Sequence, residues 1–495
     1  MKYVFFSNQG LGPKHLGIEL EVISGLKAIP QNQVISVSCD SVLNGCYFNP
    51  TKNPFGCAIC EERTRNCAKD LAIDSRHSLE DIEVQFEIPK IYSLQELLAL
   101  KYDGINIGIG VASSIISLKR DFEITTEKYG KIIQEICHTA IIALENFKKI
   151  IANIRPDGIY LFNGRFAETY PIIELCRSQN ITYNTIEVAS PGKYYIYKNS
   201  LPHSIKVKKG IMEQMWLDGY FETQKRIATE FFESKVRGNV KGRKNFINSQ
   251  QKNLLPESFD KSKYNIVFFN SSEDEMKVIE EWQHNYYESQ NQAILRIVRE
   301  NERDSNVHFY LRVHPNLADI NNKQISELQL LQEAPNLTII DAKSDVDTYG
   351  ILNACNMTIT FGSTMGIEAT YWGKPSLLIG RTFYEDTDSI YKAGSFEEIN
   401  EYIAKRLDVP KPKVNTYKYA YYFSTYGIPF KDFRYEDKKN ASFQNKKFKA
   451  VYITTILRLI TYLPKIPKWF TLHRILTGHN IRIQQLLKLY NQISK

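Results

Sequence analysis

Buried strands and amphipathic helices alternate along two separate stretches of this 495-residue chain, and no other feature limits its fold as strongly. In the first stretch, short apolar runs predict strands at residues 3–7, 33–38, 158–162 and 182–187, and a strand that runs into a turn at 105–111. Helical periodicity fills intervals between them, at residues 15–26, 126–151 and 170–177. Because this alternation is typical of a parallel sheet covered by helices on both faces, it predicts a doubly wound α/β domain.

The same alternation restarts after residue 263. Strands are predicted at residues 265–270, 307–313, 337–340, 357–361 and 375–379, with helices at 275–301, 347–354 and 365–372. The fold class is therefore α/β, with two facing doubly wound, Rossmann-like domains and a basic helical tail. We expect these parts at residues 1–200 (first domain), 201–262 (a helical, basic linker), 263–405 (second domain) and 406–495 (the tail). Ligands of such sheets bind beyond the carboxyl ends of the strands, so we expect one ligand on each side of a cleft.

The basic charge of the chain is concentrated near its end. From Lys438 to Lys495 the sequence has twelve Lys or Arg and no Asp or Glu, whereas the whole chain has 63 basic and 55 acidic residues. Aromatic and apolar residues such as Trp469 and Phe470 lie among the basic ones, which favours docking of residues 438–495 on an anionic membrane surface. A helical hairpin packed on the body and RNA binding are the alternatives. Because no nucleic-acid motif appears elsewhere, we expect no nucleic-acid partner.

The composition and the first residues indicate the compartment. Hydrophobic residues make up 43 % and charged residues 24 %, which excludes a disordered chain and a polytopic membrane protein. The apolar run in MKYVFFSNQG is too short for a signal peptide, and no stretch reaches the roughly 18 apolar residues of a membrane span. We therefore expect a cytoplasmic protein with reduced cysteines, peripheral on the inner face of the plasma membrane.

The most specific pattern is TFGSTMGIEATYWGKPSLLIG, at residues 360–380. A predicted strand ends before a turn of small residues, Gly362, Ser363 and Thr364, and a helix carrying Glu368 follows. Backbone N–H groups at a helix start, with two hydroxyls beside them, suit a phosphate or pyrophosphate. Glu368 lies one turn into the helix, within reach of a ribose diol. The alternative is an ordinary turn whose hydroxyl caps the helix.

A second pattern, RVHPN, follows the predicted strand 307–313. His314 lies at the tip of that strand, where ligands bind. Arg312 alternates with apolar neighbours, so its side chain could face the other side of the sheet. We take both as candidate donor-binding residues, with a structural histidine as the alternative.

These motifs carry a resemblance to a known family. In this order and spacing, RVHPN, SDVDTYGIL and TFGSTMGIEATYWGKPSLLIG resemble bacterial capsule and surface-polysaccharide glycosyltransferases of the GT-B type. More distantly, they are similar to teichoic-acid glycerophosphotransferases and to the UDP-N-acetylglucosamine 2-epimerase fold. The resemblance implies that the second domain holds a nucleotide diphosphate, with His314, Ser363 and Thr364 at the diphosphate and Glu368 at the ribose. Ile367 stands where the epimerases carry a further glutamate, which argues against epimerase activity.

In such enzymes the loop after the first strand faces the acceptor. Here that loop opens the segment GLGPKHLGIELE, whose glycines are not spaced as a dinucleotide motif requires. His15 is the first candidate for a general base because the ordinary pKa of histidine lies near neutral pH. Glu19, one helical turn further on, and Glu21 are its rivals. The alternative is a helix-capping histidine with solvated carboxylates.

Polar residues also follow the predicted strand 158–162, in the order Asn163-Gly164-Arg165. The glycine permits a tight turn at the strand tip. Arg165 would then point into the cleft and hold a phosphate or carboxylate, with Glu168 nearby. We expect Asn163 and Arg165 to line the acceptor side of the cleft.

Five of the eight cysteines lie close together in the sequence: Cys39, Cys46, Cys57, Cys60 and Cys67. The Cys-x2-Cys pair is a start for a structural zinc or iron–sulfur site, although a four-ligand zinc site usually shows two such pairs. Free thiols in a loop are the alternative. Asp345 and Asp347 form an Asp-x-Asp pair of the kind that can chelate a metal. We expect Ser344 or Asp345 to cap the helix predicted at 347–354, so capping is favoured over metal binding.

Together these patterns lead us to expect a glycosyltransferase. It would move a sugar from a nucleotide-sugar donor to a glycan or lipid-linked glycan acceptor of a surface polysaccharide. No cofactor is required for the chemistry we expect, because the leaving diphosphate is stabilised electrostatically while His15 deprotonates the acceptor hydroxyl. A sugar-nucleotide 2-epimerase and a non-enzymatic, membrane-docked assembly protein are the alternatives.

Overall fold

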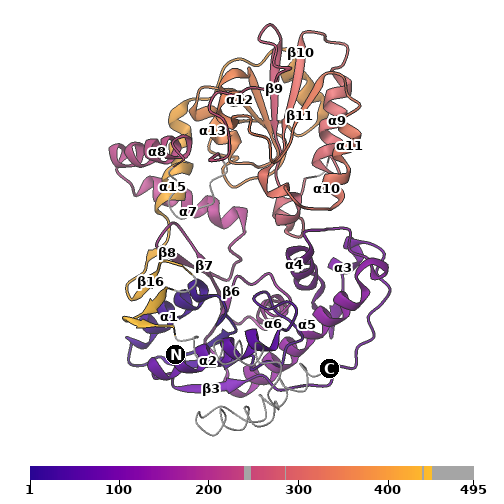
Figure 1. Ribbon diagram of the computed structural model, residues 1–495. Coiled ribbons are helices and arrows are strands. Elements are labelled where there is room, and N and C mark those ends of the chain that lie inside the picture. The colour runs from indigo at the N-terminus through magenta and orange to yellow at the C-terminus, as the bar shows by residue number, and fades with distance from the viewer. Residues whose placement is uncertain (239–246, 285, 438–439, 449–495) are drawn as a thin grey trace, which may run out of the picture.

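The computed structural model describes residues 1–238, 247–284, 286–437 and 440–448, and it places two large β-sheets in two lobes (Figure 1). The sheet of the N-terminal lobe has the strand order β15-β8-β7-β6-β1-β2-β3. The strands from β7 to β3 pair in parallel, and β8 and β15 add an antiparallel edge. These strands are β1 (Lys2–Ser7), β2 (Gln33–Ser38), β3 (Ser75–Ser78), β6 (Gly158–Phe162), β7 (Tyr183–Val188), β8 (Lys193–Lys198) and β15 (Ile428–Pro429).

Helices cover this sheet on both faces. They are α1 (Pro13–Lys27), α2 (Pro54–Asp70), α3 (Leu94–Leu98), α4 (Gly108–Lys119), α5 (Thr126–Ile154) and α6 (Tyr170–Ser178), with a hairpin of β4 (Lys101–Tyr102) and β5 (Ile105–Asn106) before α4. Successive side chains of a strand point to opposite faces. Accordingly Val4 and Phe6 pack with residues of α4, α5 and α6, whereas Phe5 packs with Ile18 and Val22 of α1.

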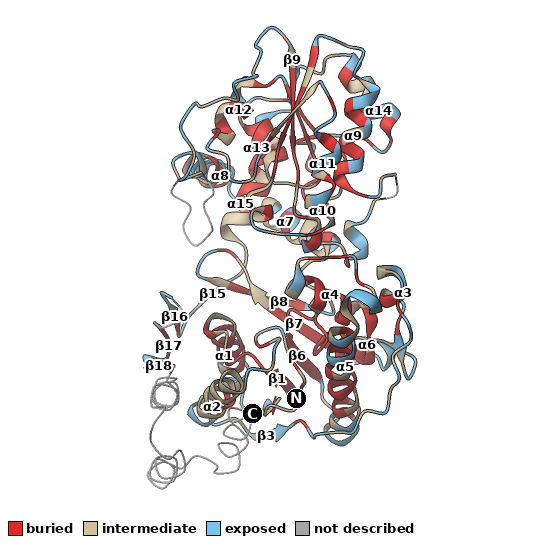
Figure 2. Cartoon of the chain, turned by 45° about the vertical axis from the view of Figure 1, so that its right-hand side comes forward, coloured by how far each residue is buried: buried red, intermediate tan, exposed pale blue. Residues whose placement is uncertain are grey.

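The sheet of the C-terminal lobe is parallel throughout, in the order β11-β10-β9-β12-β13-β14. Counted from β9, this is the order 3-2-1-4-5-6 of a Rossmann fold. Its strands are β9 (Tyr264–Phe269), β10 (Val307–Arg312), β11 (Leu337–Ile340), β12 (Met357–Thr360), β13 (Ser376–Leu378) and β14 (Tyr391–Lys392). The four central strands β10, β9, β12 and β13 are buried along almost their whole length, as the red strands in Figure 2 show. The predicted pair of doubly wound domains is therefore confirmed.

Both faces of the second sheet are also covered. Ile266 and Phe268 pack with α9 and α14, whereas Val267 and Phe269 pack with α12 and α13. The helices of this lobe are α9 (Gln290–Glu300), α10 (Lys323–Ser326), α11 (Leu328–Leu331), α12 (Thr348–Ala354), α13 (Met365–Tyr371) and α14 (Phe396–Ala404). As in the first sheet, alternate residues of the strands fill the two cores.

Two predicted elements were wrong. Residues 105–111 do not form a strand beyond Asn106, because α4 begins at Gly108, where an added Cβ would come within 1.8 Å of the Leu97 carbonyl oxygen. The long helix predicted at 275–301 begins only after Ser289, whose hydroxyl accepts the N–H of Gln292 (3.2 Å). Before it lie two 3-10 turns, η1 (Glu273–Glu275) and η2 (Glu280–Trp282).

The chain passes between the lobes through the predicted helical linker and then returns. The linker contains α7 (Ile205–Leu217) and α8 (Phe221–Val236), and α15 (Tyr417–Thr425) packs against both before β15 joins the first sheet. A small sheet of β16 (Phe433–Tyr435), β17 (Ala441–Phe443) and β18 (Lys446–Lys447) packs on α1. The start of the tail predicted at 406–495 is thus folded, because Tyr419 and Tyr422 are buried.

Residues 438–439 and 449–495, which contain most of the predicted basic tail, lie outside the described residues. Within the described part of the chain, no helix has the length and apolar character needed to cross a membrane.

Candidate active site

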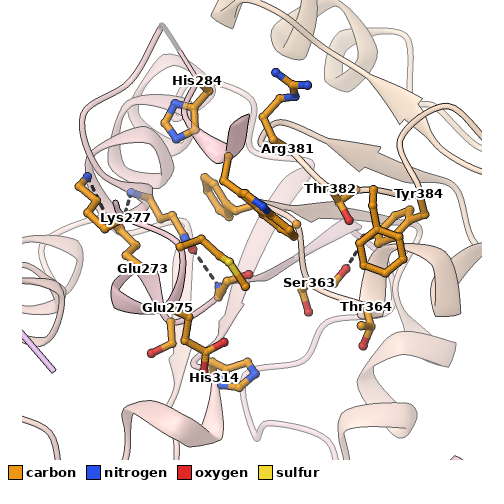
Figure 3. A pocket seen from close by; sticks show the side chains of 18 of the residues that line it. Glu273, Glu275, Lys277, His284, His314, Ser363, Thr364, Arg381, Thr382 and Tyr384 are labelled. Atoms are coloured by element: carbon orange, nitrogen blue, oxygen red, sulfur yellow. Dashed lines mark hydrogen bonds and ion pairs between the residues drawn. The ribbon is translucent and has the colours of Figure 1, made fainter. Parts of the chain in front are cut away.

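A cavity of about 390 Å³ opens at the carboxyl ends of β9, β12 and β13 (Figure 3). The sheet order reverses between β9 and β12, which is where doubly wound folds bind their ligands. The charged and imidazole side chains that line the cavity are Glu273, Glu275, Lys277, His284, His314 and Arg381. The predicted turn residues Gly362, Ser363 and Thr364 line it as well.

The turn after β12 has a backbone that only glycine adopts easily. Gly362 has a φ of +124°, and an added Cβ would lie 2.7 Å from the carbonyl oxygen of Arg381. The Ser363 hydroxyl accepts the N–H of Met365 (3.3 Å), and the Tyr384 hydroxyl donates to the Ser363 carbonyl. The helix that follows has only seven residues. Its N-terminal field is correspondingly modest, so cationic side chains are the stronger anion partners here.

His314 lies where the sequence predicts it, at the tip of β10 and in the wall of the cavity. Its backbone N–H donates to Asn270 Oδ1 (2.8 Å), and its ring Nδ1 accepts the N–H of Asn316 (3.1 Å). Because Nδ1 is the acceptor in a neutral ring, the ring proton sits on Nε2. In Figure 3 the ring lies beside Glu275.

Arg312 does not line the cavity, so its predicted contact with the donor is wrong. Its guanidinium is buried on the other side of β10. There it donates to the carbonyl of Asp341, to that of Ser344 (3.3 Å) and to the Thr348 hydroxyl (3.3 Å). Arg312 thus holds the loop that leads into α12, the helix capped by Asp347 and not by Ser344 or Asp345.

Glu368 is also directed away from the cavity. It is 2 % exposed, and its Oε1 accepts Lys235 Nζ of α8 (2.6 Å) and the Thr364 hydroxyl (2.9 Å). Its Oε2 accepts the Tyr349 hydroxyl (2.6 Å). The predicted contact with a ribose is therefore not formed, because the carboxylate is already paired within the protein.

The sequence patterns missed several lining residues. Arg381 follows β13, as Ser363 follows β12, so the rule that ligands lie at strand tips would have found it. Glu275 and Lys277 lie in the segment 275–301 that we expected to be helical, and Glu273 lies just before it, so nothing indicated that they face a ligand. Arg381 pairs with both carboxylate oxygens of Glu385 (3.0 Å each).

A second polar cluster lies at the carboxyl ends of the N-terminal strands. Asn163 follows β6 in a left-handed conformation (φ +56°), and its amide donates to Glu187 Oε2 on β7 (2.7 Å). The same amide lies 3.3 Å from His203 Nε2. His15 Nε2, near the start of α1, is 4.0 Å from Glu187 Oε1. We call His15, Asn163, Glu187 and His203 the N-terminal cluster.

Burial controls the charge state of this cluster. It raises the pKa of Glu187, and with Lys14 nearby it lowers the pKa of His15 to about 4. The pKa of Lys208, beside Glu187, falls to about 8 for the same reason. His15 is therefore neutral at physiological pH and able to accept a proton.

Unsatisfied polar atoms surround this cluster. His15 Nδ1, Asn163 Oδ1, Arg165 Nε and Glu168 Oε2 are buried without a hydrogen-bond partner in the part of the chain that the structure describes. Buried polar groups normally have partners, so these atoms are free to bind water or a polar ligand.

The two sites meet across the interface between the lobes. Arg165, which follows β6, donates from Nη1 to the carbonyl of Glu275 in the cavity wall (3.1 Å). Trp282, another wall residue, donates from its indole to the carbonyl of His203 (2.8 Å). The structure thus brings Asn163, Arg165 and His15 to the side of the interface that faces the cavity.

Both rival carboxylates of α1, Glu19 and Glu21, are buried. Glu19 accepts hydrogen bonds from the Ser7 hydroxyl and from Gln9 Nε2 (2.7 Å), and burial raises its pKa to about 7. Glu21 accepts the N–H groups of Asp432 and Phe433 (2.6 Å each) and so anchors β16. Both carboxylates face protein partners.

The clustered cysteines separate into two groups. Cys39, Cys46, Cys57 and Cys60 line one small cavity, whereas Cys67 lines another, between α2 and β17. All eight cysteines of the chain are free of disulfides. Among the described residues, no three Cys, His, Asp or Glu side chains already enclose a metal ion.

Known structures are similar to this chain only at a distance. The beta Kdo 2,4 transferase of KpsC from Thermosulfurimonas dismutans is 12 % identical, with a TM-score of 0.34, covering 54 % of this chain and 79 % of its own. UDP-GlcNAc 2-epimerase from Neisseria meningitidis is 10 % identical, with a TM-score of 0.28, covering 85 % of this chain and 98 % of its own. Scores at this level support no argument about activity.

The sequence comparisons give a more specific result. A search of curated proteins found no match. Residues 214–388 match the family model described as "Capsule polysaccharide biosynthesis protein". This range contains all three motifs on which the resemblance rests and most of the cavity lining. Over residues 214–388, the chain is thus confirmed to resemble the capsule polysaccharide biosynthesis proteins.

Proposed function

We propose that this protein is a glycosyltransferase of capsule or surface-polysaccharide synthesis, which moves a sugar from a nucleotide-sugar donor to a glycan or lipid-linked glycan acceptor. One observation supports this most. A cavity lined by cationic side chains lies where the strand order of the C-terminal sheet reverses, and it faces a cluster of unsatisfied polar groups at the N-terminal sheet. A donor and an acceptor bound at these two places would meet at the interface between the lobes.

The donor diphosphate binds in the cavity of the C-terminal lobe. Lys277, Arg381 and the Nε2–H of His314 supply positive charge or donors, and the Ser363 hydroxyl, whose oxygen accepts the Met365 N–H, adds a neutral donor. The carboxylates Glu273 and Glu275 in the same wall suit sugar hydroxyls, which donate hydrogen bonds to them. As the glycosidic bond to the diphosphate breaks, the fixed cations stabilise the leaving charge, so the chemistry needs no metal or other cofactor.

The acceptor hydroxyl loses its proton in the N-terminal cluster. His15 is the base, because its imidazole is neutral, and the Glu187 carboxyl 4.0 Å away favours the imidazolium that forms. Asn163 and Arg165 orient the acceptor. Glu19 acts through the loop that it holds and does not touch the reactants.

We place the reaction at the cytoplasmic face of the plasma membrane. The support is the sequence of residues 438–495, whose basic and aromatic side chains favour anionic lipid. A lipid-linked acceptor would be reached from that surface.

The test is a transfer assay with a panel of nucleotide sugars and capsular oligosaccharide acceptors. We expect Glu187→Gln to lower kcat by about 10²–10⁴-fold, because it removes the charge beside the base, while the affinity for the donor stays unchanged. Lys198→Met, at the exposed end of β8 in the same lobe, is the control and should leave both unchanged. A wild-type protein that binds nucleotide sugars but turns none over would contradict the proposal and favour a non-enzymatic assembly protein.

A further inference from the structure

An exposed tyrosine lies beside the N-terminal cluster, and the chemistry proposed above gives it no role. Tyr47 is 42 % exposed, whereas Phe162 and Phe166 next to it are buried. The Tyr47 ring stacks on Phe166, with 4.1 Å between the ring centroids and 23° between the ring planes, and its centroid lies 5.7 Å from that of Phe162. Phe166 therefore covers one face of the tyrosine ring, so a flat ligand would stack on the opposite face.

The turn that carries Tyr47 is held in place by buried side chains. The Tyr47 N–H donates to Glu168 Oε1 (2.9 Å), and the Thr139 hydroxyl of α5 donates to the carbonyl of Gly45 (3.1 Å). Glu168 and Thr139 are both buried. Because the turn is anchored and a tyrosine side chain has few rotatable bonds, ligand binding here loses little conformational entropy.

The rings beneath Tyr47 also pack against the residues that we propose to act on the acceptor. The Phe162 ring lies 4.6 Å from the His15 ring, centroid to centroid. The Arg165 guanidinium lies 5.0 Å from the centroid of the Phe166 ring. Tyr47 therefore adjoins both the proposed base and the arginine that contacts the wall of the C-terminal cavity.

We propose that Tyr47 binds the acceptor glycan by stacking on one of its sugar rings, and so selects acceptors whose ring has an unbroken face of C–H groups. The faces of aromatic rings are apolar and carry partial negative charge. The C–H face of a pyranose is apolar and slightly positive, so the two faces attract each other. The phenolic hydroxyl can bond a sugar hydroxyl at the same time. The inference rests on the proposed function only in naming this glycan as the acceptor.

Calorimetric titration of the full-length protein with defined oligosaccharides, without any donor, tests this inference. The panel contains chains of neutral hexoses, of N-acetylhexosamines and of hexuronic acids. We expect the wild type to bind at least one of them and Tyr47→Ala to raise its Kd about tenfold. Tyr47→Phe should retain most of the affinity. Tyr47→Leu, which keeps apolar bulk but has no aromatic face, should bind as weakly as Tyr47→Ala.

Tyr92→Ala is the matched control, because Tyr92 is also an exposed tyrosine of the N-terminal lobe (65 %) and lies just before α3. It should bind the oligosaccharide as the wild type does. None of these variants should change the Kd of a nucleotide sugar, because Tyr47 does not line the cavity of the C-terminal lobe.

NMR of the wild-type protein covers the case in which the variants do not fold. Saturation of the aromatic protons should pass mainly to the C–H protons on one face of one sugar ring. The inference is overturned if the wild type binds no oligosaccharide of the panel, or if Tyr47→Ala and Tyr92→Ala bind it equally well. Equal saturation of both faces of the sugar rings would also overturn it.

Failure of the proposed function is read separately. A protein that binds the glycan through Tyr47 but transfers no sugar keeps this inference and loses the proposed reaction. A transferase whose KM for the acceptor is the same in the wild type and in Tyr47→Ala loses the inference alone.

Discussion

At Gly362 a single residue shapes the wall of the cavity in the C-terminal lobe. Its φ of +124° and the carbonyl oxygen of Arg381, 2.7 Å from the position of a Cβ, both exclude a side chain. We expect Gly362→Ala to lower the free energy of unfolding by about 2–4 kcal/mol, since the strain of the backbone and the displacement of Arg381 add. Urea unfolding measures the change.

Gly373→Ala is the matched control for this prediction. Gly373 also has a positive φ (+79°), but no atom lies within 4 Å of its Cβ position. Only the backbone cost of about 1 kcal/mol should remain. Equal losses of unfolding free energy in the two variants would show that the contact with Arg381 does not contribute to stability.

Glu19 gives the stability of the protein a pH dependence. Its pKa is about 7 in the folded protein against an ordinary value of 4.5, so the folded state holds this proton more tightly than the unfolded state. Its contribution to stability is complete below pH 4.5 and is lost as the pH rises through 7. Glu19→Gln should therefore flatten the decline of unfolding free energy between pH 5 and 8, by at most about 1.4 kcal/mol per pH unit. Identical pH profiles of the wild type and the variant would contradict this.

For single residues, the sequence predicts the position along the fold better than the direction of the side chain. Positions at strand tips could be predicted, and His314, Ser363 and Asn163 lie there. The directions of the side chains and their bonding partners could not be predicted, because they depend on segments far away in the chain. Arg312 turns to the carbonyls of a neighbouring loop, and no local pattern indicates that turn.

At the scale of elements, Glu368 joins two helices that lie 133 positions apart. It binds Lys235 of α8 and lies on α13, next to the turn that lines the cavity. We expect Glu368→Ala to lower the free energy of unfolding by about 3–5 kcal/mol, because it leaves Lys235 largely buried without its partner. Thermal unfolding checks this. If the variant is as stable as the wild type but no longer binds nucleotide, that result would contradict the structural role and support the ribose contact predicted from the sequence.

The elements that could be predicted are those whose burial shows in the sequence. The strands at 33–38, 158–162 and 337–340 were placed to the residue, because each is a short apolar run between polar segments. The helix predicted at 275–301 failed because Trp282 and Tyr287 turn toward the cavity, so their spacing does not reflect helical packing.

At the scale of the whole molecule, an ion pair between the half-buried Arg120 and the buried Asp274 links the lobes. The Arg120 guanidinium binds the Asp274 carboxylate and the Ser272 hydroxyl (2.8 Å) across the interface. We expect Arg120→Met to widen the angle between the lobes and to raise the radius of gyration measured by small-angle X-ray scattering. Lys149→Met, which removes an exposed ion pair with Glu80 within one lobe, is the control. Equal radii in both variants would show that Arg120 does not hold the lobes together.

The central claim is that the cavity beyond β9 and β12 binds the diphosphate of a nucleotide sugar. Calorimetric titration of a panel of nucleotides and nucleotide sugars into the wild type and three variants tests it most directly. We predict that one nucleotide diphosphate family binds the wild type. Lys277→Met and Arg381→Met should each raise the Kd of that nucleotide about tenfold or more, which corresponds to a loss of ~1.4 kcal/mol of binding free energy. Lys392→Met, an exposed lysine of β14 outside the cavity, should bind like the wild type. If no nucleotide binds, or if all three variants bind as the wild type does, the proposed donor site is wrong.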